Sequence, residues 1–174
     1  MSLTNILLTG KPGVGKTTII QKIVEEHGKK AGGFYTREMR ENHRRTGFEI
    51  ITLDGKKGVL ASVHLESPYR VGKYRVNLKD LEEIGVKAIE EALHHADLVV
   101  IDEIGKMELF SKNFRKVVKQ ALDSPKKFLG TIMHGSNPFV DKIKQRADVK
   151  IFEITERNRN YITGDIKKLL EWGI

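Results

Sequence analysis

Eight consecutive residues near the N-terminus have the types and the spacing of a phosphate-binding loop. They match the pattern G-x-x-x-x-G-K-[ST] and are Gly10, Lys11, Pro12, Gly13, Val14, Gly15, Lys16 and Thr17. Glycines allow the backbone to wrap closely around an anion, so that its amide groups point at the α- and β-phosphates of a nucleotide. We expect Lys16 to reach the β- and γ-phosphates and the Thr17 hydroxyl to ligate Mg²⁺. An ordinary glycine-rich turn is the simpler alternative, but the apolar run before the motif and the helical pattern after it favour nucleotide binding.

Two carboxylates follow a second fully apolar run. Leu98–Ile101 reads as a strand, and Asp102 and Glu103 come directly after it. In proteins with a phosphate loop, such a strand is expected beside the first strand, with an Asp at its carboxyl end that helps to hold Mg²⁺. Glu103 would polarise the attacking water, a role that hydrolysis requires and transfer to another hydroxyl does not. Acidic residues also open many ordinary loops, so the pair gains its significance from the phosphate loop.

Phosphoryl transfer also needs positive charge near the transferred group. Lys106 is the nearest candidate, because it lies three residues after Glu103 on the same predicted loop. Other candidates are more simply explained as solvated surface residues, and no spacing rule selects among them: Arg37, Arg70, Arg75 and Arg115. Without a well-placed cation, we expect slow turnover.

The histidines and aromatic residues give weaker signals. His64 and His134 close apolar strands and could face a nucleotide, but ordinary strand-end positions are the favoured explanation. Phe34, Tyr35 and Phe48 could stack on a base, but aromatic residues in strands more often pack in the core.

Alternating apolar segments place these residues at the ends of strands and the starts of helices. We expect strands over Thr4–Thr9, Gly33–Arg37, Gly47–Leu53, Gly58–Val63, Leu98–Ile101, Phe128–Met133 and Val149–Ile154. We expect helices over Lys16–His27, from a cap at Asn77 to His95, from a cap at Ser111 to Leu122, from Asn137-Pro138 to Arg146, and over Asn158–Trp172. The segment Leu65–Arg75 reads as a loop. The pattern predicts an α/β fold in one domain, residues 1–174. Its mostly parallel sheet is flanked by helices on both faces, with an antiparallel hairpin insertion after the first helix.

Composition limits the classes of protein to consider. The chain has 174 residues, of which 39% are hydrophobic and 31% charged, and it has no cysteine. We expect a cytoplasmic protein that does not cross a membrane, because no apolar run approaches about 18 residues. The net charge of +8 raises nucleic acid as a partner, but the basic residues are dispersed, so this partner is not favoured.

At this point the sequence resembles the small phosphate-loop nucleoside-triphosphatases of thermophilic bacteria and archaea, which are related to the human cancer-related nucleoside-triphosphatase. The resemblance extends over the whole chain, and its most particular part is Asp102–Leu109; it also includes Gly10–Thr17, Gly33–Glu38 and Gly72–Tyr74. It implies a RecA-like fold and Mg²⁺-dependent hydrolysis of ATP, GTP, CTP, UTP and TTP to the diphosphate and phosphate. Apart from the resemblance, we expect a monomer. It also implies that one segment lines the nucleotide site: Ile101, Asp102, Glu103, Ile104, Gly105, Lys106, Met107 and Glu108.

The residues themselves agree with low base selectivity, because no Asn-Lys-x-Asp guanine-reading string follows any strand. Two alternatives remain. A small-molecule or nucleic-acid kinase would use the same phosphate loop, with Leu65–Arg75 as an arginine-bearing lid, although Glu103 argues against it. A nucleic-acid-stimulated ATPase would explain the positive charge, but no platform of aromatic and basic residues is visible.

Overall fold

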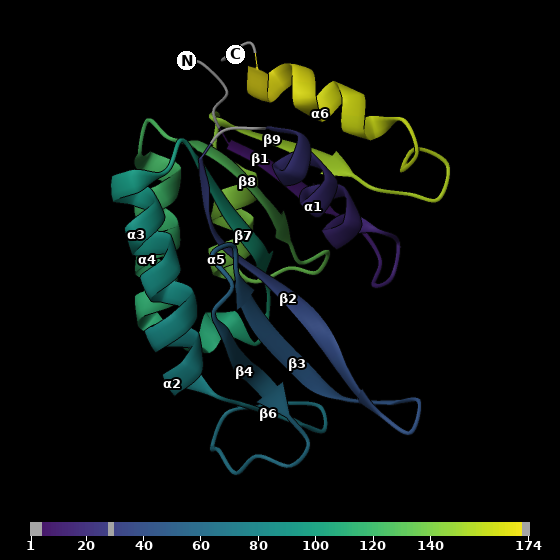
Figure 1. Ribbon diagram of the computed structural model, residues 1–174, viewed down its shortest axis with the longest axis vertical. Helices are drawn as coiled ribbons and strands as arrows, with labels where there is room; N and C mark the ends of the chain where they lie inside the picture. The colour runs from purple at the N-terminus through teal and green to yellow at the C-terminus, as the bar shows by residue number, and fades with distance from the viewer. Residues whose placement is uncertain (1–4, 28–29, 172–174) are drawn as a thin grey trace.

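The computed structural model describes residues 5–27 and 30–171 (Figure 1). Its strands are β1 (Asn5–Thr9), β2 (Ala31–Glu41), β3 (Arg44–Thr52), β4 (Lys57–Ser62), β5 (Arg70–Val71), β6 (Tyr74–Val76), β7 (Leu98–Ile104), β8 (Lys127–Ile132) and β9 (Val149–Glu153). Its α-helices are α1 (Lys16–His27), α2 (Leu78–Asp80), α3 (Lys87–His95), α4 (Lys112–Asp123), α5 (Pro138–Lys144) and α6 (Ile162–Glu171). A π-helical stretch, η1 (Leu81–Val86), joins α2 to α3, and a short 3₁₀ helix, η2 (Glu108–Phe110), precedes α4.

All strands belong to one sheet in the order β5-β6-β4-β3-β2-β7-β8-β1-β9. The half from β2 to β9 is parallel, and the half from β3 to β5 is an antiparallel extension. Strand β2 belongs to both halves, because its first residues pair with β7 and the rest pair with β3. In Figure 1 the hairpin of β2 and β3 therefore extends away from the parallel half.

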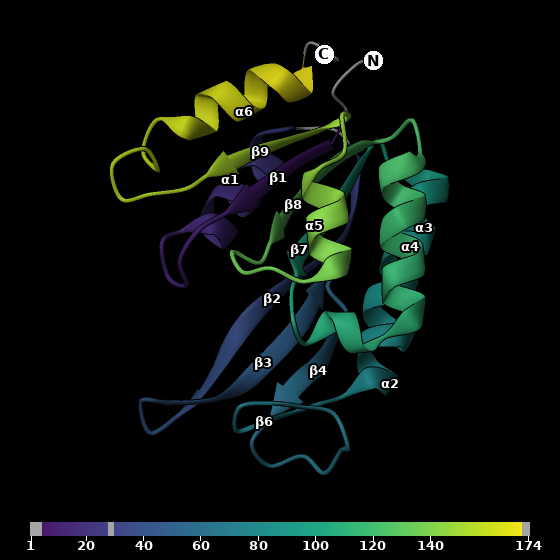
Figure 2. The same cartoon turned by 180° about the vertical axis from the view of Figure 1, so that it is seen from behind.

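Two hydrophobic layers cover the parallel half. Leu7 of β1 packs in the layer formed with α3, α4 and α5, whereas its neighbours Ile6 and Leu8 pack in the layer formed with α1 and α6. This alternation follows from the two-residue period of a strand. Figures 1 and 2 show the molecule from opposite sides, with α5 and α4 nearest the viewer in Figure 2. The predicted α/β fold, with helices on both faces and an antiparallel insertion, is confirmed.

A glycine permits the close approach of β2 to β7. Gly33 has φ +122°, and a Cβ atom there would lie 1.9 Å from the carbonyl oxygen of Val100. Any other residue would clash with β7 and strain the backbone.

The strand order differs from expectation in one respect. We expected the strand that carries Asp102 to lie beside β1, but β8 lies between β1 and β7. Strand order depends on contacts between segments far apart in the sequence, which alternation of strands and helices does not determine.

Several boundaries also differ. The expected loop Leu65–Arg75 contains β5 and the start of β6, which form a tight hairpin. The last helix begins at Ile162 rather than Asn158, because the Asn158 side chain instead bonds Thr155 and Glu153 in the preceding turns. Strand β7 continues beyond Ile101 to Ile104. Thr4 and Trp172, the expected ends of the first strand and the last helix, lie outside the described residues.

The predicted helix starts are confirmed where a side chain caps the backbone. Side-chain oxygens of Asn77, Ser111 and Asn137 each accept a hydrogen bond from the amide three residues later. None of the helices in residues 5–27 and 30–171 has the length and apolar character needed to cross a bilayer.

Candidate functional site

The predicted phosphate loop lies between β1, which is fully buried, and the first turn of α1. Gly10 has φ +148°, and a Cβ atom there would lie 2.6 Å from the carbonyl oxygen of Ile154. Gly13 and Gly15 also have positive φ angles. The strand, loop and helix that the motif requires are therefore present in the expected order.

The side chain of Lys16 folds back over this loop. Its Nζ donates a hydrogen bond to the carbonyl oxygen of Gly10 at 2.6 Å. Burial raises the pKa of both the Asp102 and the Glu103 carboxyl, and the positive charge of Lys16 opposes that rise in each. The amine of Lys16 thus acts on both predicted acidic residues.

Asp102 is held by two hydroxyl groups. Thr17 Oγ1 donates to its Oδ2 at 2.7 Å, and Thr131 Oγ1 donates to its Oδ1 at 2.7 Å. Burial raises the pKa of the Asp102 carboxyl, while the hydrogen bonds from Thr131 and Thr17 and the charge of Lys16 lower it. Thr17 and Asp102, the two residues that the sequence predicts as Mg²⁺ ligands, are thus in direct contact.

The pair fits a magnesium ion by its chemistry. A hydroxyl and a carboxylate are the hard oxygen ligands that Mg²⁺ prefers, and it usually takes only one or two protein ligands together with phosphate oxygens and water. Asp102 is buried beside the phosphate loop, so a cation would compensate a carboxylate that has little access to water.

Glu103 follows Asp102 through a cis peptide bond at a register irregularity of β7. Its side chain lies over Gly105, where a Cβ atom would be 2.6 Å from Glu103 Oε1. Burial raises the pKa of Glu103, the charge of Lys16 lowers it, and the charge of Asp102 raises it again. Glu103 is therefore a half-buried carboxylate beside the predicted phosphate-binding lysine.

Glu108 is a second acid next to Glu103, and it is almost fully buried. Burial and then the charge of Glu103 hold the pKa of Glu108 well above its usual range. Of the remaining residues in the segment, Ile101 and Ile104 are buried in the core, whereas Lys106 and Met107 reach the cavity described next.

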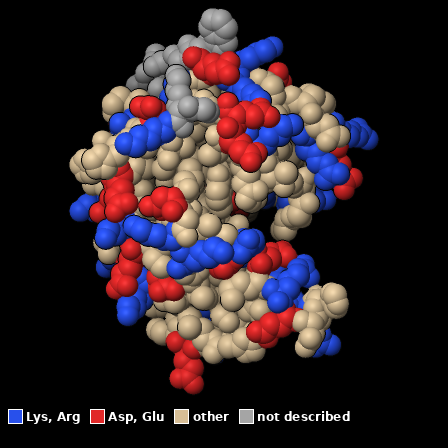
Figure 3. Space-filling view, viewed as in Figure 1, with Lys and Arg blue, Asp and Glu red and all other residues tan. Residues whose placement is uncertain are grey.

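Two cavities flank the phosphate loop. Cavity A has a volume of about 340 Å³ and is lined by Gly10, Pro12, Lys16, Thr36, Phe48, Leu60, Val71, Glu103, Lys106, Met107, Glu108, Met133, His134 and Gly135. Cavity B has a volume of about 640 Å³ and is lined by Lys11, Pro12, Gly13, Val14, His134, Glu153, Ile154, Thr155, Glu156 and Arg157. The space-filling view in Figure 3 shows a notch on this side of the molecule, between the surface over α1 and the surface over the hairpin of β2 and β3. The same view shows Lys and Arg side chains interspersed with Asp and Glu.

The candidate cations separate into two groups. Arg37 pairs with Glu49, Arg75 donates to the Ser67 carbonyl at 3.0 Å, and Arg115 donates to the Leu109 carbonyl. By contrast, Arg70 and Lys106 line one cavity of about 360 Å³, and Lys106 also lines cavity A. Of these five candidates, Lys106 alone shares cavity A with Lys16 and Glu103, and Arg70 shares a second cavity with Lys106.

The aromatic and histidine candidates also separate. Phe34 is fully buried in the core, whereas Phe48 and His134 line cavity A. His64 lies elsewhere, paired with Glu41. Tyr35 lies close enough to Asp102 for that charge to contribute to the raised pKa of its phenol, although burial is the larger cause.

Sequence reasoning missed Arg159. Its Nη1 donates to the carbonyl oxygen of Val14 at 3.3 Å, so the segment before α6 supports the phosphate loop from outside. The two residues are 145 positions apart, and no motif or spacing links them.

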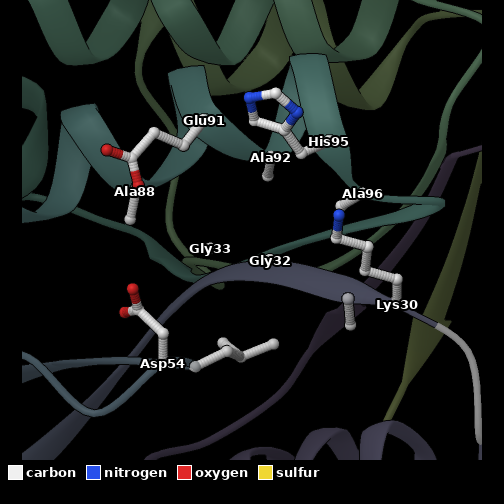
Figure 4. A pocket seen from close by; sticks show the side chains of 11 residues that line it. Lys30, Gly32, Gly33, Asp54, Ala88, Glu91, Ala92, His95 and Ala96 are labelled. Atoms are coloured by element: carbon white, nitrogen blue, oxygen red, sulfur yellow. The ribbon is translucent and has the colours of Figure 1, made fainter.

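A third cavity, about 180 Å³, lies between β2 and α3, away from the phosphate loop (Figure 4). It borders a close contact of β2 and α3, in which a Cβ atom on Gly32 would lie 2.7 Å from that of Ala92. Figure 4 shows Asp54 pointing toward α3 from the turn after β3. None of the predicted site residues lines this cavity.

Comparisons with known proteins identify relatives with a similar sequence and a similar fold. The sequence profile of a family described as "NTPase" matches residues 5–167. The chain is 58% identical to nucleoside-triphosphatase THEP1 of Thermotoga maritima over 167 residues, which are 96% of this chain and 95% of that protein. It is 41% identical to the human cancer-related nucleoside-triphosphatase over 182 residues, 93% of this chain and 94% of that protein. The crystal structure of THEP1 from Aquifex aeolicus superposes with a TM-score of 0.89 at 43% identity, covering 96% of this chain and 99% of that one.

Proposed function

Because the chain belongs to this nucleoside-triphosphatase family, we propose that it hydrolyses ATP, GTP, CTP, UTP and TTP to the diphosphate and phosphate, with Mg²⁺ as cofactor. One observation carries the proposal: the hydrogen bond from Thr17 to Asp102, which joins the phosphate loop to the acidic end of β7. That contact brings the two expected magnesium ligands together beside Lys16 and Glu103.

The phosphate loop binds the nucleotide through its amide groups and Lys16. The Lys16 amine exchanges the Gly10 carbonyl oxygen for phosphate oxygens, which are stronger acceptors because they carry charge. Gly10, Gly13 and Gly15 allow the loop to follow the phosphates without a side chain in the way. Arg159 holds the outer side of the loop through Val14.

Thr17 and Asp102 would hold the magnesium ion. A magnesium ion held by these two residues would supply positive charge to the phosphate groups of the nucleotide. Thr131 keeps the Asp102 carboxylate in one orientation by bonding its second oxygen. This support leaves one carboxylate oxygen directed at Thr17 and the phosphate loop.

Glu103 orients the attacking water. Its carboxylate lies at the cavity wall with Lys16, so it accepts a hydrogen bond from a water placed against the γ-phosphate. Lys106 supplies positive charge to the transferred group from the same cavity. Lys106 is exposed, and an exposed cation is screened by water, so we expect slow turnover.

Cavity B receives the nucleoside. It borders the outer side of the phosphate loop and is the larger of the two flanking cavities. Its side chains at Thr155, Glu156 and Arg157 are exposed, so they offer no rigid, buried pattern of donors and acceptors against a base. This accounts for low base selectivity. We further propose that residues 1–174 act as one domain and as a monomer in the cytoplasm, with nucleic acid not required.

The test is release of free phosphate from all five nucleoside triphosphates, with and without Mg²⁺. We expect comparable Mg²⁺-dependent rates for the five, and loss of release in Lys16→Ala. The exposed Lys22→Ala on α1 is the matched control and retains release. Release from one nucleotide alone would contradict low base selectivity, and release without divalent metal would contradict the roles of Thr17 and Asp102.

A further inference from the structure

Cavity A lies at the reactive end of the predicted phosphate chain. Lys16 and Glu103, which act at the γ-phosphate in the proposed function, both line cavity A, and neither lines cavity B. The nucleoside therefore leaves the loop toward cavity B. Cavity A remains on the side from which an attacking group approaches.

Cavity A is larger than one attacking water requires. A water molecule takes about 30 Å³ in the liquid, and benzene is known to fit an apolar cavity of about 150 Å³. Cavity A has about 340 Å³, and five apolar side chains from separate segments form much of its wall: Phe48, Leu60, Val71, Met107 and Met133. Such walls are poor partners for water and good partners for an apolar molecule.

The wall has the chemistry to hold an aromatic ring. Phe48 offers an aromatic ring that two neighbours keep in place. The Tyr74 ring lies 5.3 Å from it between centroids, and the Arg45 guanidinium lies 5.3 Å from the centroid of the Phe48 ring. Met107 and Met133 offer thioethers, which make favourable contacts with aromatic rings. An aromatic ligand would therefore have three matched partners in the wall: Phe48, Met107 and Met133.

The elements that supply this wall are not needed to bind phosphates. Phe48 comes from β3, Leu60 from β4 and Val71 from β5, all in the antiparallel extension. The extension also reaches η2, because Tyr69 beside β5 contacts the Phe110 ring at 5.4 Å between centroids. An apolar wall and the reactive residues Lys16 and Glu103 thus line the same cavity.

From this the geometry points to a second activity: cavity A is an acceptor site, in which the hydroxyl of an aromatic alcohol of one or two rings takes the γ-phosphoryl group in place of water. The inference rests on the proposed function for the phosphate side of the site. The alcohol oxygen bonds the γ-phosphorus, the bond from that phosphorus to the β–γ bridging oxygen breaks, and the nucleoside diphosphate leaves. A carboxylate that accepts a proton from water can also accept one from an alcohol, so the presence of Glu103 does not exclude this transfer. The hydroxyl proton passes to the Glu103 carboxylate, and the product is a phosphate monoester.

The test uses the full chain with Mg²⁺, ATP labelled at the γ-phosphate, and either benzyl alcohol or 2-naphthalenemethanol as the probe. Labelled ester and free phosphate are separated and counted. We expect ester to form at the expense of free phosphate. Toluene and 2-methylnaphthalene, which lack the hydroxyl, should lower phosphate release without giving ester.

Two variants locate the effect. Val71→Trp fills cavity A and should lower ester formation by at least about tenfold, because a pocket rejects a substrate that no longer fits. Val63→Trp makes the same change at a half-buried valine after β4 that does not line cavity A, and should keep ester formation. If Val71→Trp loses hydrolysis as well, Phe48→Ala, which removes the aromatic wall, replaces it in the comparison.

The outcomes separate the two proposals. Normal hydrolysis with no ester from either alcohol overturns the acceptor site and leaves the proposed hydrolysis intact. Ester that forms equally in Val71→Trp, Phe48→Ala and the unchanged chain also overturns cavity A as its site. Ester formation without free phosphate release in the absence of alcohol would instead reject hydrolysis as the main reaction.

Discussion

Thr17 Oγ1 donates a hydrogen bond to Asp102 Oδ2 at 2.7 Å, although the two residues are 85 positions apart. Thr17 lies in the first turn of α1, and Asp102 lies near the carboxyl end of β7. The contact ties the phosphate loop to the acidic end of β7, and most of the predictions below concern the residues around it.

Lys16→Ala should lose nucleotide affinity and activity together. Hydrogen bonds to charged groups contribute about 1.5–3 kcal/mol, so we expect the dissociation constant for ATP to rise by about 10- to 150-fold. Calorimetric titration and phosphate release measure the two effects. Lys22→Ala is the control, and an unchanged dissociation constant in Lys16→Ala would contradict the predicted contact.

Glu103→Gln should bind ATP as before but turn over slowly. The amide retains the size of the side chain and loses the capacity to accept a proton, and such a loss costs about 10²- to 10⁴-fold in rate. Single-turnover hydrolysis and ATP binding are measured side by side, with the exposed Glu90→Gln on α3 as the control. A near-normal rate would remove Glu103 from the water-orienting role.

Thr131→Val should weaken the response to Mg²⁺. The valine cannot donate to Asp102 Oδ1, and groups that orient a metal ligand typically contribute about 10- to 100-fold in metal affinity. A titration of the hydrolysis rate with Mg²⁺ gives the half-saturating concentration. Thr163→Val changes another buried threonine on α6, where the half-saturating concentration should stay the same. Equal shifts in both variants would show that Thr131 acts only through stability.

Glu108→Gln should stabilise the metal-free protein, and the gain should grow with pH. Burial raises the pKa of Glu108 in the folded state above its value in the unfolded state. The stability that the protonated Glu108 contributes to the unchanged chain is therefore fully present below the unfolded pKa. It is lost as pH rises through the folded pKa. Over that window the variant gains about 1.4 kcal/mol in unfolding free energy for each pH unit, relative to the unchanged chain. Urea unfolding with a chelator at several pH values measures the difference. The exposed Glu91→Gln should show no such trend, and a gain that is independent of pH would contradict the buried acid.

Gly33→Ala should destabilise the fold more than Gly55→Ala. Both glycines have positive φ, so both variants carry a backbone cost of about 1–2 kcal/mol. Only at Gly33 does the new Cβ meet the Val100 carbonyl, because nothing lies within 4 Å of the Cβ position at Gly55. Thermal and urea unfolding compare the two, and equal losses would show that the contact between β2 and β7 relaxes freely.

Local signals predicted much of the framework. The helix caps at Asn77, Ser111 and Asn137 were predictable because each side chain bonds a neighbour three residues away. The strand before Asp102 was predictable because a buried parallel strand is apolar throughout. In each case, residues close in sequence carry the information.

Distant contacts were not predictable in the same way. The insertion of β8 between β1 and β7 depends on how separate strands fit together. The contact from Arg159 to Val14, and the apolar wall that Phe48, Leu60 and Val71 share, join segments with no common pattern. The hairpin of β5 and β6 is too short to leave a period in the sequence, and its tip at Gly72 reads as loop.

The pairing of β1 also bears on when the phosphate loop takes shape during synthesis. In the described part of the chain, β1 pairs with β8 and β9, and the nearer of these in sequence begins at Lys127. The ribosome therefore completes the loop at Thr17, but makes the neighbours of its supporting strand only from Lys127 onward. Until then the nascent chain exposes an apolar strand without a partner, which is the kind of segment that chaperones and aggregation compete for. The strand that supports the phosphate loop thus gains its partners only after more than a hundred further residues have been made.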